Sequence, residues 1–416
     1  MLRYSRAALL AGALLVTGGP SLAETVSLNQ AVAKALEAAP LMRAEQAAIA
    51  AAGAGKAQAD VRPDPSVTVE AENFVGTGPY SVLRRTEVTA TYNQPIERGG
   101  KRAARVALAE REIGVASASA EVTRLELAAA VQRTFLDILI AQQIEAIAKQ
   151  QLSIEQGLQS EALRRVRGYK DPLFVETRAA ARVARARIAL AQSQARLRNA
   201  RDVLASFWGG DGVDLAVDGE LSLGGDQASE LAEADQALEE ARVARASAAV
   251  RVEQTRKTQD YTVSGGTRFI KGTNDIALVA GITIPLGRFD RNQGNIERAR
   301  AERLRLELTA EANRLERLRR RASLGAEAER ALSWANSIKS DVYPRVAKTL
   351  AQVRDGYNRG GFSFRDIQDA ADAIIEAQDE WLAAMIEYRD LQTEIDRLTG
   401  RFAAPLATIS EGHTQP

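Results

Sequence analysis

The stretch "GITIPLGRFDRNQGNIERARAERL", residues 281–304, joins an apolar segment to a long charged one. The apolar part ends at Pro285, and after a short polar stretch a helical pattern continues to about Asn358. Residues 90–112, "ATYNQPIERGGKRAARVALAERE", make the same transition from a strand-like run, through a proline, into a helical pattern. At a rise of 1.5 Å per residue, a helix of about 65 residues spans on the order of 100 Å. The chain therefore twice joins a short strand to a helix too long for a globular core.

Four segments alternate between apolar and polar residues, and they form two pairs: 65–75 with 86–95, and 261–271 with 275–285. Each is about ten residues long, which matches the roughly 9–11 residues of a tilted strand that crosses a bilayer. One face is apolar and the other carries carboxylates, as expected where one side meets lipid and the other a wet lumen. A two-stranded ribbon packed on a helix in a globular protein would alternate in the same way.

Helical periodicity fills most of the remaining chain. Alanine, leucine, arginine and glutamate dominate these segments, and all four favour helices. The pattern and its length indicate coiled-coil packing. The predicted helices are 28–60 with a break at Pro40, 100–166, 172–208 with Pro172 at the first helical position, 229–257, 294–358 and 363–399.

The order helix, strand pair, long helix and shorter helix occurs twice, which indicates an internal duplication. Pro95 and Pro285 mark equivalent points of the two repeats. The predicted organisation is a signal peptide at 1–23, a first repeat at 24–208, an equatorial linker at 209–228, a second repeat at 229–402 and a polar tail at 403–416.

Composition excludes several classes of site. The 416 residues include no cysteine and one histidine, His413 in the tail, so neither a zinc or copper cage nor an anchor cysteine is available. The formal charge of +1 does not indicate a nucleic-acid surface. Arg3, Arg6 and the apolar run that follows them fit a signal peptide cleaved after Ala23, and the run is too short for a membrane-spanning anchor.

Four strands per chain cannot close a membrane barrel, because the smallest such barrels have about eight. An open sheet edge in lipid leaves backbone groups unpaired, at several kcal/mol each, so the chains must associate. The helices that follow the strands would then form a tube, and the assembly would be a conduit. A periplasmic coiled-coil scaffold or adaptor is the alternative, although adaptors add a block of short strands that this sequence lacks. An enzyme is disfavoured because no catalytic residues and no phosphate loop can be assigned.

Three motifs resemble the TolC-type outer membrane factor family over nearly the whole mature chain: "IPLGRFDRNQGNIERARAE" at 284–302, "GYNRGGFSFRDIQDAADAIIEAQDEW" at 356–381 and "RGYKDPLFVETRAA" at 167–180. The first is similar to the CzcC-like heavy-metal efflux branch. The resemblance implies an α+β membrane protein, a homotrimer whose four strands per protomer complete a twelve-stranded β-barrel above a long α-helical coiled-coil tunnel. It also implies outer-membrane localisation, a periplasmic adaptor and an inner-membrane pump of the resistance-nodulation-division class as partners, and no cofactor.

The resemblance also assigns candidate residues at the periplasmic tips. Asp366 and Asp369, three residues apart on one helix face, match the pair that rings the pore constriction; three copies of each would attract cations. Two solvated aspartates at a helix start are the alternative interpretation. The turns that would contact the adaptor contain Gly168 and Tyr169 in the first repeat and Tyr357 and Gly360 in the second.

The sequence departs from the family pattern at the gate. Phe362 occupies the position of an arginine that links neighbouring helices in the closed state, and Phe174 that of its acidic partner. Closure would therefore rest on apolar or other contacts. Five residues at the strand-to-helix junctions either line the passage or stabilise turns: Arg98, Arg288, Asp290, Arg291 and Asn292. Heavy-metal cations are the expected substrate, and an efflux or secretion channel for organic compounds stays open as an alternative.

Overall fold

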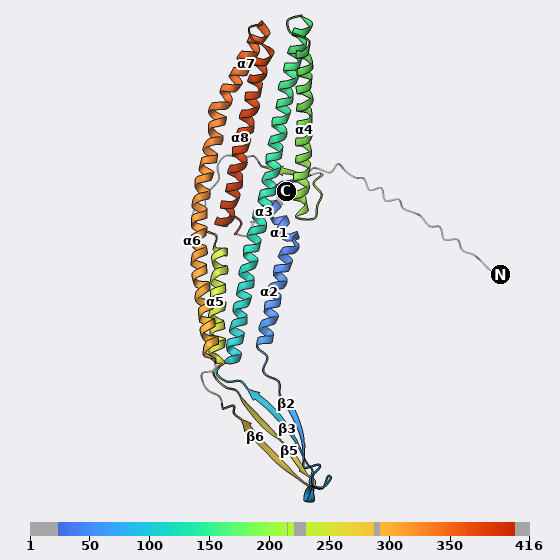
Figure 1. Cartoon of the computed structure of the whole chain (residues 1–416), viewed down its shortest axis with the longest axis vertical. Helices are drawn as coiled ribbons and strands as arrows, with labels where there is room; N and C mark the ends of the chain where they lie inside the picture. Colours follow the sequence, from blue (N-terminus) through green and yellow to red (C-terminus); the bar gives the residue numbers. More distant parts are fainter. Residues whose placement is uncertain (1–23, 214, 220–229, 287–291, 404–416) are drawn as a thin grey trace, which may run out of the picture. The chain divides into compact units, whose positions relative to one another are not determined.

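The computed structural model describes residues 24–213, 215–219, 230–286 and 292–403 (Figure 1). The expected signal peptide, most of the polar tail and part of the linker lie outside these residues. The chain divides into two compact units, one made of residues 1–34 with 134–222 and the other of 35–133 with 223–416. Within the described ranges, no helix has the length and apolarity needed to cross a bilayer. The division into two sequence repeats stays a prediction.

The predicted helices are present, with bounds close to those expected. The break at Pro40 is confirmed, because Ala39 is extended and Pro40 opens the next helix, where its missing N–H costs nothing. The helices are α1 (Leu28–Ala38), α2 (Pro40–Ala59), α3 (Lys101–Arg167), α4 (Phe174–Ser206), α5 (Glu233–Thr255), α6 (Gln293–Ser337), α7 (Tyr343–Arg359) and α8 (Phe364–Thr399).

Three local features differ from the prediction. Pro172 lies before α4 and not at its first position, since its carbonyl accepts a hydrogen bond from Val175 while α4 begins at Phe174. The long helix 294–358 is interrupted by a π-helical turn, η2 (Ile338–Val342), just before Pro344. Short parallel strands β1 (Glu24–Ser27) and β4 (Leu215–Asp218) pair in the first unit, and four residues are too few to leave a periodic signal.

The four longer strands are present, as their alternation predicts, and they form one antiparallel sheet in the order β2-β3-β5-β6. They are β2 (Ser66–Glu72), β3 (Glu87–Ile96), β5 (Tyr261–Ile270) and β6 (Asp275–Thr283). Residues opposite each other in register share a face. Val67 therefore lies beside Tyr92, and Phe269 beside Ile276.

The two faces of this sheet differ in chemistry. On one face, large apolar side chains are exposed in the protomer, with Val69 67%, Ile276 74% and Leu278 87% accessible. On the other, the Arg268 guanidinium donates to Glu87 Oε2 at 3.1 Å and to Thr89 Oγ1 at 3.0 Å. A sheet whose apolar face was covered by its own chain would bury these side chains. The apolar face of this sheet is instead exposed in the protomer.

The first unit contains a helical hairpin made of α4 and the last part of α3. A buried stripe of α4 recurs at helical spacing through Val175, Ala179 and Val183. Arg182 of α4 donates a bidentate pair of hydrogen bonds to Glu155 of α3, with nitrogen–oxygen distances of 2.6–3.0 Å, and Glu155 is almost fully buried. A bidentate ion pair of this kind has a defined geometry, and it therefore helps to fix the register of the two helices.

In the second unit, α6 and α8 pack through a cluster made of Leu324, Ala328, Ala331, Tyr388 and Ile395. Close to it, the buried carboxylate of Asp396 accepts hydrogen bonds from Gln132 at 2.6 Å, Gln392 at 2.8 Å and Arg401 at 2.7 Å. Three donors compensate the desolvation of this charge.

Candidate functional site

The turn between α7 and α8 is a tight, glycine-dependent structure. Gly360 has φ 87°, its N–H donates to the carbonyl of Tyr357, and the N–H of Gly361 donates to the carbonyl of Gly356. These two bonds define a Schellman motif, which requires a left-handed residue at the position of Gly360. The sequence-predicted turn is thus present, and Gly360 is needed for its backbone conformation.

Aromatic side chains pack this turn from both sides. Phe362 folds back against Gly356 so closely that a Cβ atom there would lie 2.2 Å from its ring carbon Cδ2. Phe362 still leaves 46% of its surface exposed. Tyr357 is fully buried, with its ring centroid 6.0 Å from that of Phe364. Tyr357 therefore supports the turn from beneath, whereas Phe362 is partly available at its surface.

Asp366 and Asp369 lie at the start of α8 but differ in what they bind. Asp366 closes a capping box, because its carboxylate accepts from both the N–H and the hydroxyl of Ser363 at 2.7 Å. These hydrogen bonds lower the pKa of Asp366. Asp369 is exposed and lies 3.8 Å from the guanidinium of Arg365. In the protomer, Asp366 thus has the helix-start role that the sequence left as an alternative, and Asp369 projects into solvent.

The turn between α3 and α4 presents exposed aromatic and apolar side chains. Tyr169 has φ 57° and is 97% accessible, while Phe174 is 63% accessible. The turn is held by Gly168, whose N–H donates to Arg164, and by Arg165, which donates to both carboxylate oxygens of Asp171 at 2.9 Å. The hydrogen-bonded turn therefore leaves Tyr169 exposed, and Phe174 is exposed where α4 begins.

Sequence reasoning missed a longer acidic face that begins at Asp369. Carboxylates recur along α8 at intervals that keep them on one side of the helix, opposite its buried face. Their i, i+3 and i+4 spacing is visible in the sequence and could have revealed them. The exposed members are Asp369, Asp372, Glu376, Asp379, Glu380 and Asp390. Towards the end of α8, Glu387 and Glu394 pair with Arg330 and Arg320 of α6 at 2.6 and 2.8 Å.

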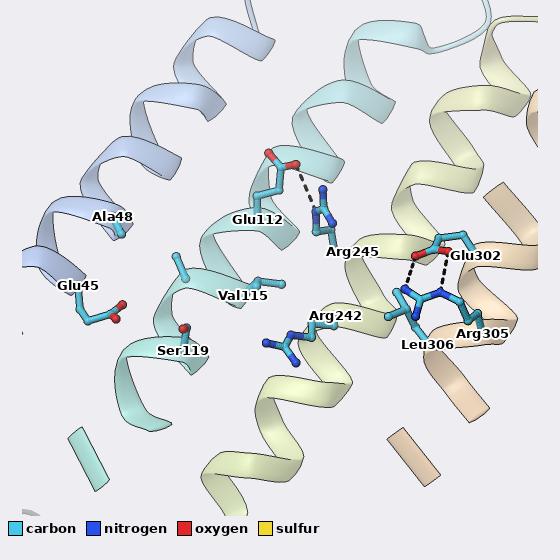
Figure 2. Close-up of a pocket in the computed structure, with 11 residues that line it drawn as sticks. Glu45, Ala48, Glu112, Val115, Ser119, Arg242, Arg245, Glu302, Arg305 and Leu306 are labelled. Carbon is cyan, nitrogen blue, oxygen red and sulfur yellow. Dashed lines mark hydrogen bonds and ion pairs between the residues drawn. The ribbon is translucent and has the colours of Figure 1, made fainter. Parts of the chain in front are cut away.

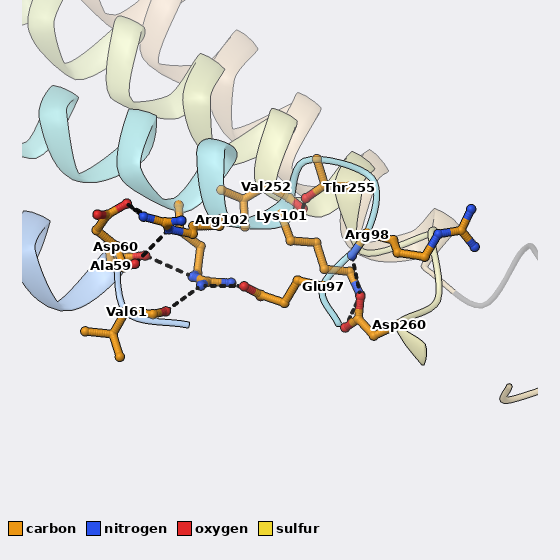
Figure 3. Close-up of polar contacts among 11 residues, drawn as sticks. Ala59, Asp60, Val61, Glu97, Arg98, Lys101, Arg102, Val252, Thr255 and Asp260 are labelled. Carbon is orange, nitrogen blue, oxygen red and sulfur yellow. Dashed lines mark hydrogen bonds and ion pairs between the residues drawn. The ribbon is translucent and has the colours of Figure 1, made fainter. Parts of the chain in front are cut away.

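A polar network fastens the helices to the strands (Figure 3). Arg102 of α3 donates to the carboxylate of Asp60 at the end of α2, a bond that lowers the pKa of Asp60. Lys101 pairs with Asp260 at 2.7 Å, and the N–H of Arg98 donates to the same carboxylate at 2.9 Å. The Arg98 guanidinium lies 4.1 Å from the centre of the Tyr261 ring. Of the two interpretations of Arg98, turn stabilisation is the one these contacts support.

The second junction has a similar arrangement. Asn292 precedes α6, and its amide donates to the carbonyl of Glu253 at 2.7 Å and to the carboxylate of the same residue at 3.1 Å. Asn292 thus ties the start of α6 to the end of α5. Arg288, Asp290 and Arg291, at the same junction, lie outside the described residues.

A groove of about 510 Å³ lies among α2, α3, α5 and α6 of the second unit (Figure 2). Its charged side chains are compensated within the groove: Glu112 pairs with Arg245 at 3.4 Å, and Glu302 with Arg305 at 2.7 Å. Across the described part of the chain, no three histidine, cysteine or carboxylate side chains converge in a way that could hold a metal ion. The groove has therefore no excess of charge to attract a cation.

Comparison with known proteins identifies the family. The family described as "Outer membrane efflux protein" matches residues 31–210. The chain is similar to the cobalt-zinc-cadmium resistance protein CzcC of Cupriavidus metallidurans, with 32% identity over 321 residues that cover 75% of this chain and 77% of that protein. It is 27% identical to the nickel-cobalt-cadmium resistance protein NccC of Alcaligenes xylosoxydans xylosoxydans, over 71% of each chain.

Solved structures show the same fold. The outer membrane protein VceC of Vibrio cholerae matches with a TM-score of 0.73 and 18% identity, over 90% of this chain and 96% of that one. CusC matches with a TM-score of 0.70 and 14% identity, over 94% and 98%. These neighbours agree with the expected combination of long helices and few strands, and the family consists of outer-membrane channel proteins and not enzymes. The chain belongs to the outer membrane efflux protein family, and within it resembles the proteins of heavy-metal resistance.

Proposed function

We propose that this protein is the outer-membrane channel of a tripartite efflux system. The observation that carries the proposal is the sheet β2-β3-β5-β6, which has an exposed apolar face, a polar face and two open edges. A sheet with these properties is suited to lipid on one side and water on the other. Its four strands need further strands to close, which supports a homotrimer with a twelve-stranded barrel and a helical tunnel in the periplasm.

The proposed cargo is a heavy-metal cation. The support is the similarity to relatives named for cobalt, zinc, cadmium and nickel resistance, together with the acidic face of α8. Carboxylates that are displayed without a converging ligand set attract cations and release them, as a conduit requires. Selectivity among metals would then belong to the pump. Asp366 and Asp369 are the proposed start of this acidic path at the tip.

The proposed gate is apolar. Phe362 lies in the turn before α8, Phe174 is the first residue of α4, and both side chains are partly exposed, so that neighbouring subunits could bring them together. The proposed adaptor contacts are the turn residues Gly168, Tyr169 and Gly360, with Tyr357 holding the second turn from inside. The partners are a periplasmic adaptor and an inner-membrane pump of the resistance-nodulation-division class.

The experiment that tests the cargo compares metal and drug tolerance of a deletion strain side by side. We expect sensitivity to divalent transition-metal cations with unchanged tolerance of organic drugs, restored by the wild-type chain on a plasmid. Sensitivity to drugs without sensitivity to metals would overturn the metal assignment and favour export of organic compounds. A protein that leaves the membrane fraction in a carbonate wash would favour a periplasmic scaffold.

A further inference from the structure

Two connections lie at the end of the sheet that is remote from the helices of the second unit (Figure 1). Residues 73–86 join β2 to β3, and residues 271–274 join β5 to β6. At the opposite end, the four strands connect to α2, α3, α5 and α6. The proposed channel has its helices in the periplasm, and it therefore places both connections at the outer leaflet of the membrane.

The longer connection, residues 73–86, folds back on itself. The N–H of Leu83 donates to the carbonyl of Phe74 at 3.0 Å and so joins its two limbs. The short helical turn η1 (Gly78–Tyr80) lies between them. The chain approaches itself closely at Gly76, where an added Cβ atom would lie 2.9 Å from the Cβ atom of Tyr80. These contacts give the loop a compact backbone that does not depend on its larger side chains being buried.

Large apolar side chains are exposed over most of this loop. The part of a protein surface that meets only water rarely gathers such side chains in one place, and where it does, the cluster marks contact with lipid or with another molecule. Aromatic side chains such as tyrosine are enriched at the interface between membrane and water. Five side chains of residues 74–83 are 43–69% accessible: Phe74, Val75, Tyr80, Val82 and Leu83.

Three cations adjoin these apolar side chains. Residues 73–86 and 271–274 contain Arg84, Arg85 and Lys271 and no carboxylate. All three are exposed, and in the described ranges none of them has a carboxylate within ion-pair distance. Arg85 links the two connections, because its guanidinium lies 5.9 Å from the centre of the Tyr80 ring and a Cβ atom at Gly272 would lie 3.7 Å from its Cγ. The two connections thus form one surface with a net positive charge.

The register of the strands places Lys271 at the end of the apolar face. Phe269 belongs to the last apolar row of that face, and Lys271 is two residues further along. The N–H of Lys271 donates to the carbonyl of Thr86 at 3.0 Å, so the pairing continues and keeps Lys271 on the same face, about 7 Å beyond Phe269. The nearest carboxylates lie on the opposite, polar face: Glu72, Glu87 and Asp275.

We propose that this surface binds a phosphorylated glycolipid of the outer leaflet, an inference that rests on the proposed function. Arg84, Arg85 and Lys271 contact the phosphate groups, and the exposed apolar side chains of residues 74–83 pack against the acyl chains and sugar rings. Arginine donates paired hydrogen bonds to phosphate oxygens, and lysine supplies a point charge. Lipopolysaccharide has this chemistry. A free phosphate ion would satisfy the cations alone and leave the apolar side chains in water.

The test compares two lipids that have the same acyl chains, bisphosphorylated lipid A and its dephosphorylated form. Each is added to the purified full-length protein in detergent, and bound lipid is counted by native mass spectrometry. We expect the wild type to prefer the bisphosphorylated form. Replacing Arg84, Arg85 and Lys271 together by glutamine should weaken its binding roughly a hundredfold, since each cation near an anionic lipid surface contributes about fivefold. Binding of the dephosphorylated form should not change.

A matched control removes the same charge elsewhere. Arg178, Arg185 and Arg187 of α4 are exposed, and their replacement by glutamine should leave the binding of both lipids at the wild-type level. An equal loss of binding in this control would mean that only net charge attracts the lipid, which overturns the site. Inorganic phosphate at the concentration of the lipid should not displace it, and complete displacement would overturn the apolar half of the contact.

A second variant tests that apolar half directly. Val75 and Val82 are each 69% accessible, so their replacement by serine removes little packing within the loop. We expect weaker binding of both lipid forms. Unchanged binding would overturn the apolar contact, and a higher conductance in the same variant would place the loop over the mouth of the pore instead.

The outcomes separate this inference from the proposed function. Equal affinity of the wild type for the two lipids, or wild-type binding by the glutamine variant of the loop, overturns the phosphate contact. A protein that still conducts in planar bilayers then leaves the proposed channel intact. A protein that leaves the membrane in a carbonate wash and gives no conductance overturns the channel, and with it the position of this surface at the outer leaflet.

Discussion

Replacing Gly356 by alanine tests how the turn between α7 and α8 holds Phe362. The added Cβ atom would meet the Phe362 ring at 2.2 and 2.5 Å, so the ring must leave its position. The atoms it meets belong to a partly exposed side chain and not to backbone, and the ring can therefore move without unfolding the helix. We expect the substitution to displace the aromatic side chain that the proposed gate uses.

For Gly356→Ala, the stability lost when Phe362 is displaced and the stability gained when alanine replaces glycine in the helix nearly cancel. Full burial of a phenylalanine side chain contributes about 1.5–3 kcal/mol, and Phe362 is roughly half buried, so its displacement costs about 1 kcal/mol. Alanine in place of glycine within a helix gains about 1 kcal/mol. Gly356→Ala should therefore leave local stability almost unchanged, whereas Phe362→Ala alone loses about 1 kcal/mol. In the Phe362→Ala background the clash is absent, and Gly356→Ala should then gain about 1 kcal/mol.

Two assays measure the double-mutant cycle formed by wild type, Gly356→Ala, Phe362→Ala and the double variant. Hydrogen exchange of the last-turn amides of α7 measures the local free energies, and the predicted coupling between the two positions is about 1 kcal/mol. Conductance in planar bilayers and antibiotic exclusion in cells measure closure. We expect both Gly356→Ala and Phe362→Ala to leak, and the double variant to leak no more than either. An additive cycle, or a Gly356→Ala channel as tight as wild type, would refute the reasoning.

The other predictions concern the sheet, the helix start and the buried network. Gly266→Ala should prevent pairing of β3 with β5, because its Cβ would lie 2.0 Å from a backbone oxygen. The control Gly265→Ala, whose Cβ meets nothing within 4 Å, should assemble normally. The yield of heat-sensitive trimer measures assembly of both variants, and equal yields would contradict this prediction. Ser363→Ala should cost about 1 kcal/mol at the start of α8. The hydrogen bonds that Ser363 donates lower the pKa of the Asp366 carboxylate, so the separate contribution of these bonds is present at neutral pH and is lost as the pH falls through the lowered pKa. The pH dependence of amide exchange in the first turn of α8 should therefore flatten in the variant. Asp396→Ala removes a buried acceptor of three hydrogen bonds and should cost about 3 kcal/mol, visible in the thermal unfolding midpoint; an unchanged midpoint would contradict the packing described.

The sequence predicts the regular parts of this fold because long amphipathic helices and alternating strands leave strong periodic signals. The bounds of α3, α8 and all four long strands follow from that periodicity. The π-helical turn before Pro344 could not be predicted, since proline inside a long helix is compatible with a kink, a break or a bulge. The β1–β4 pair depends on residues about 190 positions apart and has no local signal.

The candidate site is only partly predictable. The position of Asp366 and Asp369 on one helix face follows from their spacing, but the capping box requires the rotamer of Ser363, which no pattern gives. Tyr357 matches a turn motif and is nevertheless buried. It lies on the face of α7 that packs against Phe364 of α8. Sequence spacing thus assigns residues to helix faces, whereas the contacts of each side chain depend on the turn geometry.

The claim that this chain forms a lipid-embedded, cation-conducting pore is tested most directly by the reversal potential of the purified protein in planar bilayers under a salt gradient. The account predicts discrete conductance steps with a reversal potential close to that of the cation, and a shift towards zero when Asp369, Asp372 and Glu376 are replaced by their amides. A trimer that inserts and conducts without cation preference would contradict the role of the acidic face. A folded protein that never produces conductance steps would contradict the pore itself.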